Sequence, residues 1–144
     1  MKLALATGFA LLAAFVVITW WALESGGVAI VETQAHDGTV RSTHIWYADS
    51  DGELWLEAGT PENAWFVDLQ SNPQLRLKIG EHSQPYTAEV IGAPSGHGRI
   101  RALMRRKYGF RDRWVGAIVD TSSSIAVRLQ PRQTSSGVAA ETTP

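Results

Sequence analysis

Cysteine is absent from the sequence of 144 residues. Its absence excludes disulfides, thiolate metal sites, iron–sulfur clusters and thiol nucleophiles. Histidine is scarce, and its positions are His36, His44, His82 and His97. No two of these histidines are four residues apart and no carboxylate motif accompanies them, so no metal site is predicted. The spacing of the remaining polar residues indicates no catalytic acid, base or nucleophile.

The sequence has almost no net charge, but its basic residues are concentrated in one segment. Fourteen acidic and thirteen basic residues give a formal net charge of −1. The segment RIRALMRRKYGFRDR, residues 99–113, contains seven of the thirteen basic residues and a single acid, Asp112. Such a segment attracts a phosphate-bearing cofactor or an anionic lipid surface, although a solvated helix face has the same pattern. The overall acidity argues against nucleic acid as a partner.

The longest uncharged run is at the N-terminus. LALATGFALLAAFVVITWWAL extends from Leu3 to Leu23, and as a helix its length matches a hydrocarbon core of roughly 30 Å. Trp20 and Trp21 follow the preference of indole rings for the headgroup layer. We therefore predict a single-pass transmembrane anchor over 1–24, a membrane localisation and contact with membrane lipid. A cleaved signal peptide is the alternative.

Alternating apolar residues, β-branched residues and turn signals predict six strands. They cover residues 28–34, 41–49, 53–59, 74–80, 85–92 and 124–130. Thr60 as an N-cap and Pro61 at the first helical position predict a short helix after the third strand. A helical period from Gly98 predicts a second helix that ends at Gly109. Residues 110–120 fit either a short helix or an extended connection.

These elements predict one domain of the mainly β (α+β) class over residues 28–131. The fourth and fifth strands are expected to form a hairpin with its turn over 81–84. Six short strands with intervening helices favour a small antiparallel barrel, because closure removes exposed sheet edges. Residues 132–144 are polar, small and flanked by proline, so this tail is predicted to be disordered.

Several strings of the sequence follow one family pattern. Residues 36–41, HDGTVR, place a glycine and a closing arginine in a hairpin, and STHIWY follows them. AWFVDLQSNPQLRLKIG leads from a helix to a strand, and RRKYGFRDRW and DTSSSIAVRL come near the end. Together these strings, between Val28 and about Pro131, resemble the split β-barrel oxidoreductases. The similarity is to the deazaflavin (F420)-dependent nitroreductase/quinone reductase family and, more distantly, to the pyridoxamine phosphate oxidase-like FMN proteins.

The resemblance implies a split antiparallel β-barrel that binds F420, with FMN as the alternative cofactor. Arg41, Ser42 and Thr43 stand where the family presents donors to a cofactor phosphate, and an arginine fork and hydroxyls suit that group. Trp46 and Trp65 are expected to line the site of the cofactor ring.

The resemblance also implies hydride transfer to a quinone- or nitro-type acceptor, with the redox chemistry supplied by the cofactor. Lys107 and Tyr108 are also expected among the cofactor-binding residues, on the side of the acceptor. A homodimer is expected because these barrels usually build the pocket across two subunits. Arg41 has a structural alternative, which is an ion pair with Glu32 across the hairpin.

Departures from the family pattern favour a second hypothesis. His36 stands where the family has Lys or Arg, and Asp37 stands where it has Ser or Thr. The loop over residues 59–62 is short, contains Glu62 and lacks the family's lysine. Asp37 and Glu62 would repel a phosphate that they faced. The alternative function is therefore a non-enzymatic, membrane-tethered interaction module on a barrel that binds no cofactor.

Overall fold

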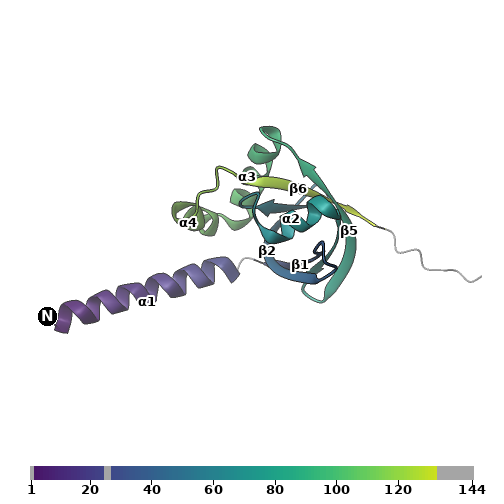
Figure 1. Cartoon of the computed structure of the whole chain (residues 1–144). Helices are drawn as coiled ribbons and strands as arrows, with labels where there is room; N and C mark the ends of the chain where they lie inside the picture. Colours follow the sequence, from purple (N-terminus) through teal and green to yellow (C-terminus); the bar gives the residue numbers. More distant parts are fainter. Residues whose placement is uncertain (1, 25–26, 133–144) are drawn as a thin grey trace, which may run out of the picture.

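Six antiparallel strands close into a barrel in the computed structural model, which describes residues 2–24 and 27–132 (Figure 1). The strands are β1 (Val28–Gln34), β2 (Val40–Ser50), β3 (Glu53–Ala58), β4 (Gln74–Ile79), β5 (His82–Ile91) and β6 (Ile125–Pro131). The helices are α1 (Lys2–Glu24), α2 (Ala64–Ser71), α3 (Ser95–Tyr108) and α4 (Phe110–Ile118). Around the barrel the strand order is β1–β2–β3–β6–β5–β4. The predicted six-stranded antiparallel barrel is confirmed, whereas the predicted disordered tail lies outside the described residues except for Arg132.

A tight turn at Gly80 and Glu81 joins β4 to β5. Ile79 pairs with His82 across this turn. Gly80 has a φ of 58°, a left-handed conformation that glycine adopts without a Cβ clash. The predicted turn over 81–84 is therefore wrong, and β5 begins at His82.

Apolar side chains fill the inside of the barrel, and α2 packs onto this inner core. The cluster includes Val31, Leu56, Leu77, Val127 and, from α2, Trp65, Phe66 and Leu69. Every second residue of a strand points into the barrel, as the predicted alternation of apolar residues requires. The helix begins at Ala64 rather than at Pro61, because Thr60 to Asn63 form a turn in which the Asn63 N–H donates to the Thr60 carbonyl oxygen (3.3 Å).

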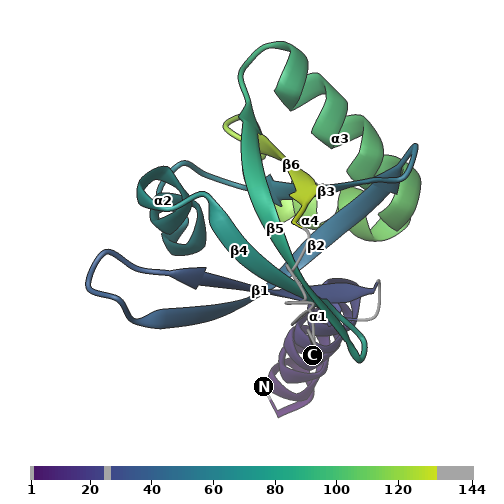
Figure 2. The ribbon, with the colours of Figure 1, turned by 90° about the vertical axis from the view of Figure 1, so that its right-hand side faces the viewer.

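A second core lies outside the barrel, between α3 and the strands β2, β3 and β6 (Figure 2). Its members from α3 are Ile100, Leu103, Met104 and Tyr108. The predicted apolar face of this helix is therefore confirmed. Gly96, in the first turn, lies so close to β5 that a Cβ at this position would clash with the carbonyl oxygen of Ile91. Residues 110–118, for which the sequence left two possibilities, form the helix α4.

The hydroxyl of Tyr108 connects the end of α3 to the sheet. It accepts a hydrogen bond from the Tyr47 N–H (3.0 Å) and donates to the carbonyl oxygen of Gly27 or of Tyr47 (each 3.0 Å). The ring stacks on Trp46, with centroids 4.2 Å apart. Burial raises the pKa of Tyr108 to about 12, so the hydroxyl keeps its proton and remains a donor at neutral pH.

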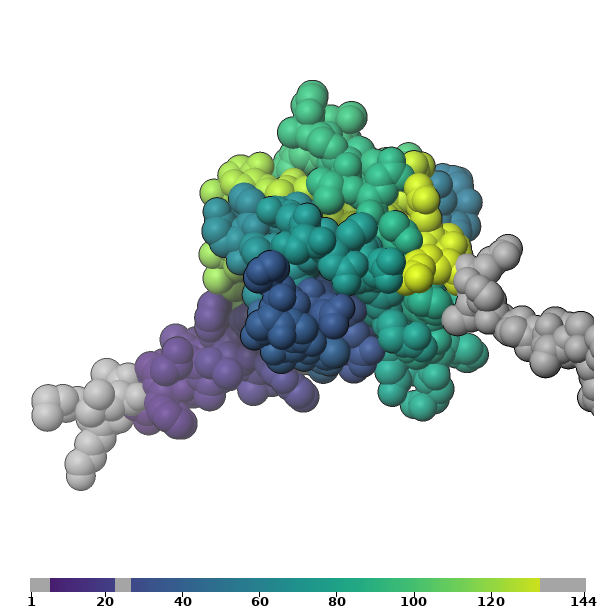
Figure 3. Space-filling model, turned by 45° about the vertical axis from the view of Figure 1, so that its right-hand side comes forward, coloured from purple at the N-terminus to yellow at the C-terminus, as the bar shows by residue number. Residues whose placement is uncertain are grey.

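The helix α1 projects from the barrel and contacts mainly α4 (Figure 1, Figure 3). Trp114 of α4 donates to the hydroxyl of Thr19 (3.2 Å), and its ring lies 5.8 Å from that of Phe15. A search of the described residues finds no helix with the length and apolar character needed to cross a membrane. The predicted transmembrane anchor over 1–24 is therefore not supported.

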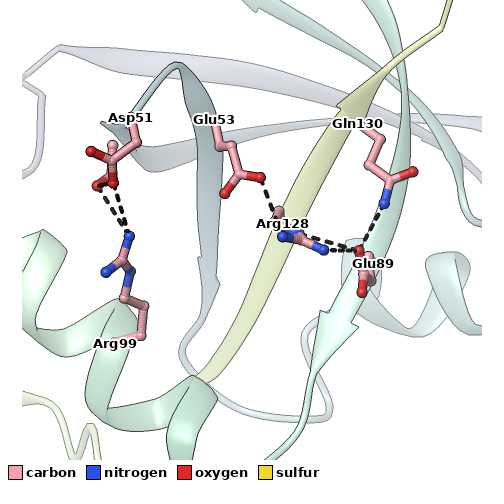
Figure 4. Close-up of polar contacts among 7 residues, drawn as sticks. Asp51, Glu53, Glu89, Arg99, Arg128 and Gln130 are labelled. Atoms are coloured by element: carbon pink, nitrogen blue, oxygen red, sulfur yellow. Dashed lines mark hydrogen bonds and ion pairs between the residues drawn. The ribbon is translucent and has the colours of Figure 1, made fainter.

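Ion pairs on the outer surface join three neighbouring strands. Arg128 of β6 lies between Glu53 of β3 (3.2 Å) and Glu89 of β5 (2.7 Å), and Gln130 also donates to Glu89 (2.8 Å) (Figure 4). The hydrogen bond from Arg128 is the main cause that lowers the pKa of Glu89. Because these side chains remain partly exposed to solvent, the pairs favour one strand register and contribute little to stability.

Replacing Gly96 with alanine is expected to lower the free energy of unfolding by about 1–3 kcal/mol, because the new Cβ forces α3 away from Ile91. Gly98→Ala is the matched control, since the space around Gly98 in the same helix is open. This control is expected to be neutral or to stabilise by up to about 1 kcal/mol, as alanine favours helix. Urea denaturation followed by tryptophan fluorescence measures both. Equal stabilities would contradict the close approach of α3 to β5.

Removal of the Tyr108 hydroxyl is expected to lower the free energy of unfolding by about 1–3 kcal/mol, because Tyr108→Phe leaves the Tyr47 N–H and the Gly27 carbonyl without this partner. Tyr86→Phe is the control, since the Tyr86 hydroxyl only donates to the side chain of Gln84, at 3.3 Å. Its expected cost is below about 0.5 kcal/mol. Losses of the same size in thermal unfolding of the two variants would show that this hydroxyl does not connect α3 to the sheet.

Candidate cofactor-binding site

A cavity of about 640 Å³ lies between β2, the start of α2 and α4. Its wall includes the consecutive β2 residues 41–46 and parts of the segment 119–124, which follows α4. Glu57 of β3 and Arg101 of α3 also line it. The cavity therefore combines segments that are distant in sequence, and the packing of α3 and α4 beside β2 and β3 determines its shape.

Five of the seven residues predicted to bind the cofactor line this cavity. Arg41, Ser42 and Thr43 form one part of the wall that β2 contributes. Trp46 lies farther along β2, and Trp65 lies on α2. The structure thus brings the predicted phosphate donors and the predicted aromatic side chains to one cavity. Cofactor binding by these residues remains a prediction.

The buried carboxylate of Asp68 orients Arg41. Its Oδ2 accepts hydrogen bonds from the Thr33 hydroxyl (2.8 Å) and from Nε of Arg41 (2.9 Å). Asp68 is only 6% exposed, whereas the Arg41 side chain is 44% exposed. Both Nη groups of Arg41 have no partner among the described residues. The predicted alternative, a pair between Arg41 and Glu32, is not what the structure shows.

Asp68 was not identified as a functional residue from the sequence, although one signal was present. It lies between Trp65 and Leu69 on the buried face of a short helix, and an acid at such a position needs a partner. Since that partner is Arg41, 27 residues earlier in the chain, only the tertiary structure identifies it.

Lys107 and Tyr108, also predicted to bind the cofactor, do not line the cavity. Nζ of Lys107 donates to the carbonyl oxygen of Tyr47 (2.8 Å) and lies 3.1 Å from the centroid of the Tyr47 ring. Partial burial lowers the pKa of Lys107 to about 8, and the charge of Asp49 opposes this shift. Tyr108 supports the site indirectly, because it stacks on Trp46, which lines the cavity.

The acids that were expected to repel a phosphate lie elsewhere. Neither Asp37 nor Glu62 lines the cavity. The carboxylate of Asp37 accepts a hydrogen bond from the Thr39 N–H (2.9 Å), which is the main cause that lowers its pKa. His36 also lies outside this cavity. Of the residues that depart from the family pattern, His36, Asp37 and Glu62 therefore lie outside the cavity, whereas the short loop over 59–62 contributes Gly59 to its wall.

A buried ionic cluster lines another part of the cavity. Nη1 of Arg101 donates to both carboxylate oxygens of Glu57 (2.8 and 2.9 Å), and Nη2 donates to Oδ1 of Asp112 (2.6 Å). Burial alone would lower the pKa of Arg101, but hydrogen bonds and charges from Glu57 and Asp112 raise it above its ordinary value. The cluster was not predicted, although two features of the sequence could have indicated it. Arg101 shares the helix face of Met104 and Tyr108, and Asp112 is the single acid of the basic segment.

Most of the basic side chains in residues 99–113, which were predicted to create a positive field, are paired with other groups of the protein. These contacts join Arg99 to Asp51, Arg101 to Glu57 and Asp112, Arg106 to Ser50, Lys107 to Tyr47 and Arg111 to Trp21. The side chains of Arg105 and Arg113 have no partner among the described residues. Most of the basic segment therefore attaches α3 and α4 to the barrel and to α1, and does not form a free cationic face.

Comparison with known proteins places these features in a family. The family model described as F420H(2)-dependent quinone reductase matches residues 20–130. No curated protein matches the chain. A similar solved structure is the conserved hypothetical protein Rv2991 from Mycobacterium tuberculosis, with 22% identity, a TM-score of 0.59 and coverage of 82% of this chain and 80% of that chain.

Two further structures share the fold. One is a candidate pyridoxamine 5'-phosphate oxidase from Listeria innocua, with 16% identity, a TM-score of 0.56 and coverage of 78% of this chain and 89% of that chain. The other is described as an F420 reductase, with 14% identity, a TM-score of 0.53 and coverage of 78% and 91%. At these identities the likeness shows the split-barrel fold. Since the family model extends from the end of α1 almost to the end of β6, the chain belongs to the F420H(2)-dependent quinone reductase family.

Proposed function

We propose that this protein binds F420 in the 640 Å³ cavity and reduces a quinone-type acceptor. The observation that carries the proposal is that Arg41 lines a cavity walled by Trp46 and Trp65 while neither of its Nη groups has a partner among the described residues. Membership of an F420H(2)-dependent quinone reductase family supports the cofactor and the class of acceptor. FMN as cofactor and a nitro-type acceptor are the alternatives.

The donor set of the cavity fits a cofactor that combines a phosphate with a planar ring. A guanidinium fork forms paired, charge-assisted hydrogen bonds with phosphate oxygens, and the hydroxyls of Ser42 and Thr43 are adjacent in sequence to it. Indole rings such as those of Trp46 and Trp65 offer flat apolar surface to a heterocycle. The cavity volume lies within the usual range for sites that enclose small organic ligands.

Each of these residues has a defined task in the proposed reaction. Bound F420 in its reduced form supplies the hydride, and the chain binds, orients and shields it. Asp68 fixes the direction of the Arg41 fork through Nε, and Tyr108 fixes one face of Trp46. Asp112 and Val115 of α4 also line the cavity and would shield a bound ring from water on their side. The expected homodimer remains part of this proposal.

The Arg41 side chain provides the direct test. Arg41→Ala is expected to weaken F420 binding by about tenfold or more, because a charge-assisted hydrogen bond contributes roughly 1.5–3 kcal/mol. Arg76→Ala is the matched control, since Arg76 is an exposed arginine on β4 that does not line the cavity. Quenching of tryptophan fluorescence, with the full chain titrated by F420 and separately by FMN, measures the affinities.

Equal F420 affinities of the folded Arg41→Ala variant and the unaltered protein would contradict the proposed phosphate site. Selective binding of FMN that Arg41→Ala removes would identify the alternative cofactor. No binding of either cofactor to the folded protein would favour the module that lacks a cofactor.

We also propose a second function, attachment of the protein to a lipid surface through α1. Large apolar side chains of this helix are strongly exposed, among them Phe9 (74%), Leu11 (67%), Leu12 (61%), Val16 (57%) and Val17 (62%). Exposed apolar surface of this kind marks an interaction site. A membrane localisation would follow, and it is compatible with a reductase whose acceptor is dissolved in lipid.

Replacing Phe9, Leu12 and Val16 together with serine is expected to reduce co-sedimentation with phosphatidylcholine vesicles severalfold, because burial of apolar area contributes about 25 cal/mol per Å². Charge reversal of Arg105 and Arg113 is the control and is expected to change binding only to phosphatidylglycerol vesicles. Unaltered sedimentation of the serine variant would exclude α1 as the lipid-binding element.

A further inference from the structure

The cluster of Glu57, Arg101 and Asp112 contains an unbalanced charge. Its side chains are 10%, 9% and 3% exposed, respectively. Two carboxylates and one guanidinium give the cluster a formal charge of −1. A buried net charge is unfavourable unless further polar groups or charges compensate it. Since all three residues line the cavity, a ligand in the cavity is in a position to provide the missing donors.

Two acceptor atoms in the wall of this cavity have no hydrogen-bond partner in the part of the chain that the structure describes. Oδ1 of Asp112 accepts a hydrogen bond from Arg101, whereas Oδ2 of Asp112 accepts no hydrogen bond from the described residues. Ser124, which lines the same cavity, is 4% exposed, and its hydroxyl is buried without a hydrogen-bond partner. Of these two atoms, the Ser124 hydroxyl is the buried one. Buried polar atoms are nearly always paired, so this hydroxyl calls for an explanation. These two observations come from different segments of the chain and both concern the wall of one cavity.

The cluster and Arg41 lie at different ends of the cavity. Tyr47 of β2 pairs with Leu56, the residue before Glu57, whereas Arg41 precedes Tyr47 by six residues on the same strand. Continued by one residue, this register places Glu57 opposite Trp46, five residues from Arg41, so Glu57 and Arg41 are roughly 17 Å apart along β2 at about 3.3 Å per residue. One end of the cavity therefore presents the Nη donors of Arg41, which have no partner among the described residues, and the other end presents carboxylate and hydroxyl acceptors.

We propose that the carboxylates of Glu57 and Asp112 and the hydroxyl of Ser124, with Arg101 holding the two carboxylates in place, form a subsite that accepts hydrogen bonds from the N–H edge of a planar heterocycle. This inference rests on the proposed function and adds the recognition of the cofactor's ring. An imide N–H of a flavin-type ring is a donor of the required kind, while the negative charge of the cluster repels a phosphate. The two ends of the cavity together determine the direction in which an extended ligand with a phosphate and a ring lies.

Truncated ligands separate the two ends experimentally. The full chain is titrated with F420, with the phosphate-free deazaflavin chromophore, and with the same chromophore methylated at its imide nitrogen. Glu57→Gln and Asp112→Asn remove charge at nearly constant volume, and Ser124→Ala removes the unpaired hydroxyl. Asp51→Asn is the matched control, because Asp51 is an exposed carboxylate that also pairs with an arginine but lies outside the cavity.

The expected result is that Glu57→Gln and Asp112→Asn each weaken binding of the phosphate-free chromophore by about tenfold, the effect of losing a charge-assisted hydrogen bond. Ser124→Ala is expected to weaken it by about threefold, and this variant keeps the ionic cluster intact if a carboxylate variant fails to fold. For the chromophore methylated at its imide nitrogen, these variants and the unaltered protein are expected to have equal affinities. Arg41→Ala is expected to affect F420 but not the phosphate-free chromophore.

Unchanged affinity of folded Glu57→Gln, Asp112→Asn and Ser124→Ala for the phosphate-free chromophore would overturn the subsite. If Arg41→Ala still weakens F420 binding in that case, the proposed function stands and only the subsite fails. If the unaltered protein binds neither F420 nor the chromophore, the proposed function fails and the subsite fails with it.

Discussion

The pairing of β6 with both β3 and β5 is the constraint on which the rest of the structure depends. β6 is the last strand in sequence, yet it closes the barrel between two strands that precede it by many residues. Without it, β3 and β5 would each expose a row of unpaired backbone groups. Arg128, which lies at the centre of this closure, pairs with an acid on each neighbouring strand (Figure 4).

Closure by β6 also decides where the site lies. The chain between β5 and β6 forms α3 and α4, so the return of the chain to β3 holds α3 over the outer face of β2 and β3 and α4 against α3. The cavity is the space that remains beside β2 when α4 and the start of α2 approach it. The barrel strand β2 thus supplies one wall of the site, and the elements packed around the barrel supply the rest.

Buried charges attach the surrounding elements more specifically than apolar contacts do. Asp68 connects α2 to β1 and β2 through Thr33 and Arg41, and Arg101 connects α3 to β3 and α4 through Glu57 and Asp112. Removing one partner from such a pair leaves an uncompensated charge, so each connection has one favourable geometry. Both connections border the same cavity, and as a result its two ends differ in charge.

The sequence by itself determined the strands, the apolar face of α3, the donor-rich start of β2 and the family. These features depend on local periodicity and on motifs of neighbouring residues, which a single chain displays directly. Only the tertiary structure decided which charges are paired. Arg41 meets Asp68 across 27 residues and Arg101 meets Glu57 across 44 residues, whereas the sequence alone suggested Glu32 for Arg41 and a free cationic face for Arg101. Partners so distant in sequence become neighbours only through barrel closure and helix packing, and no local pattern contains that information.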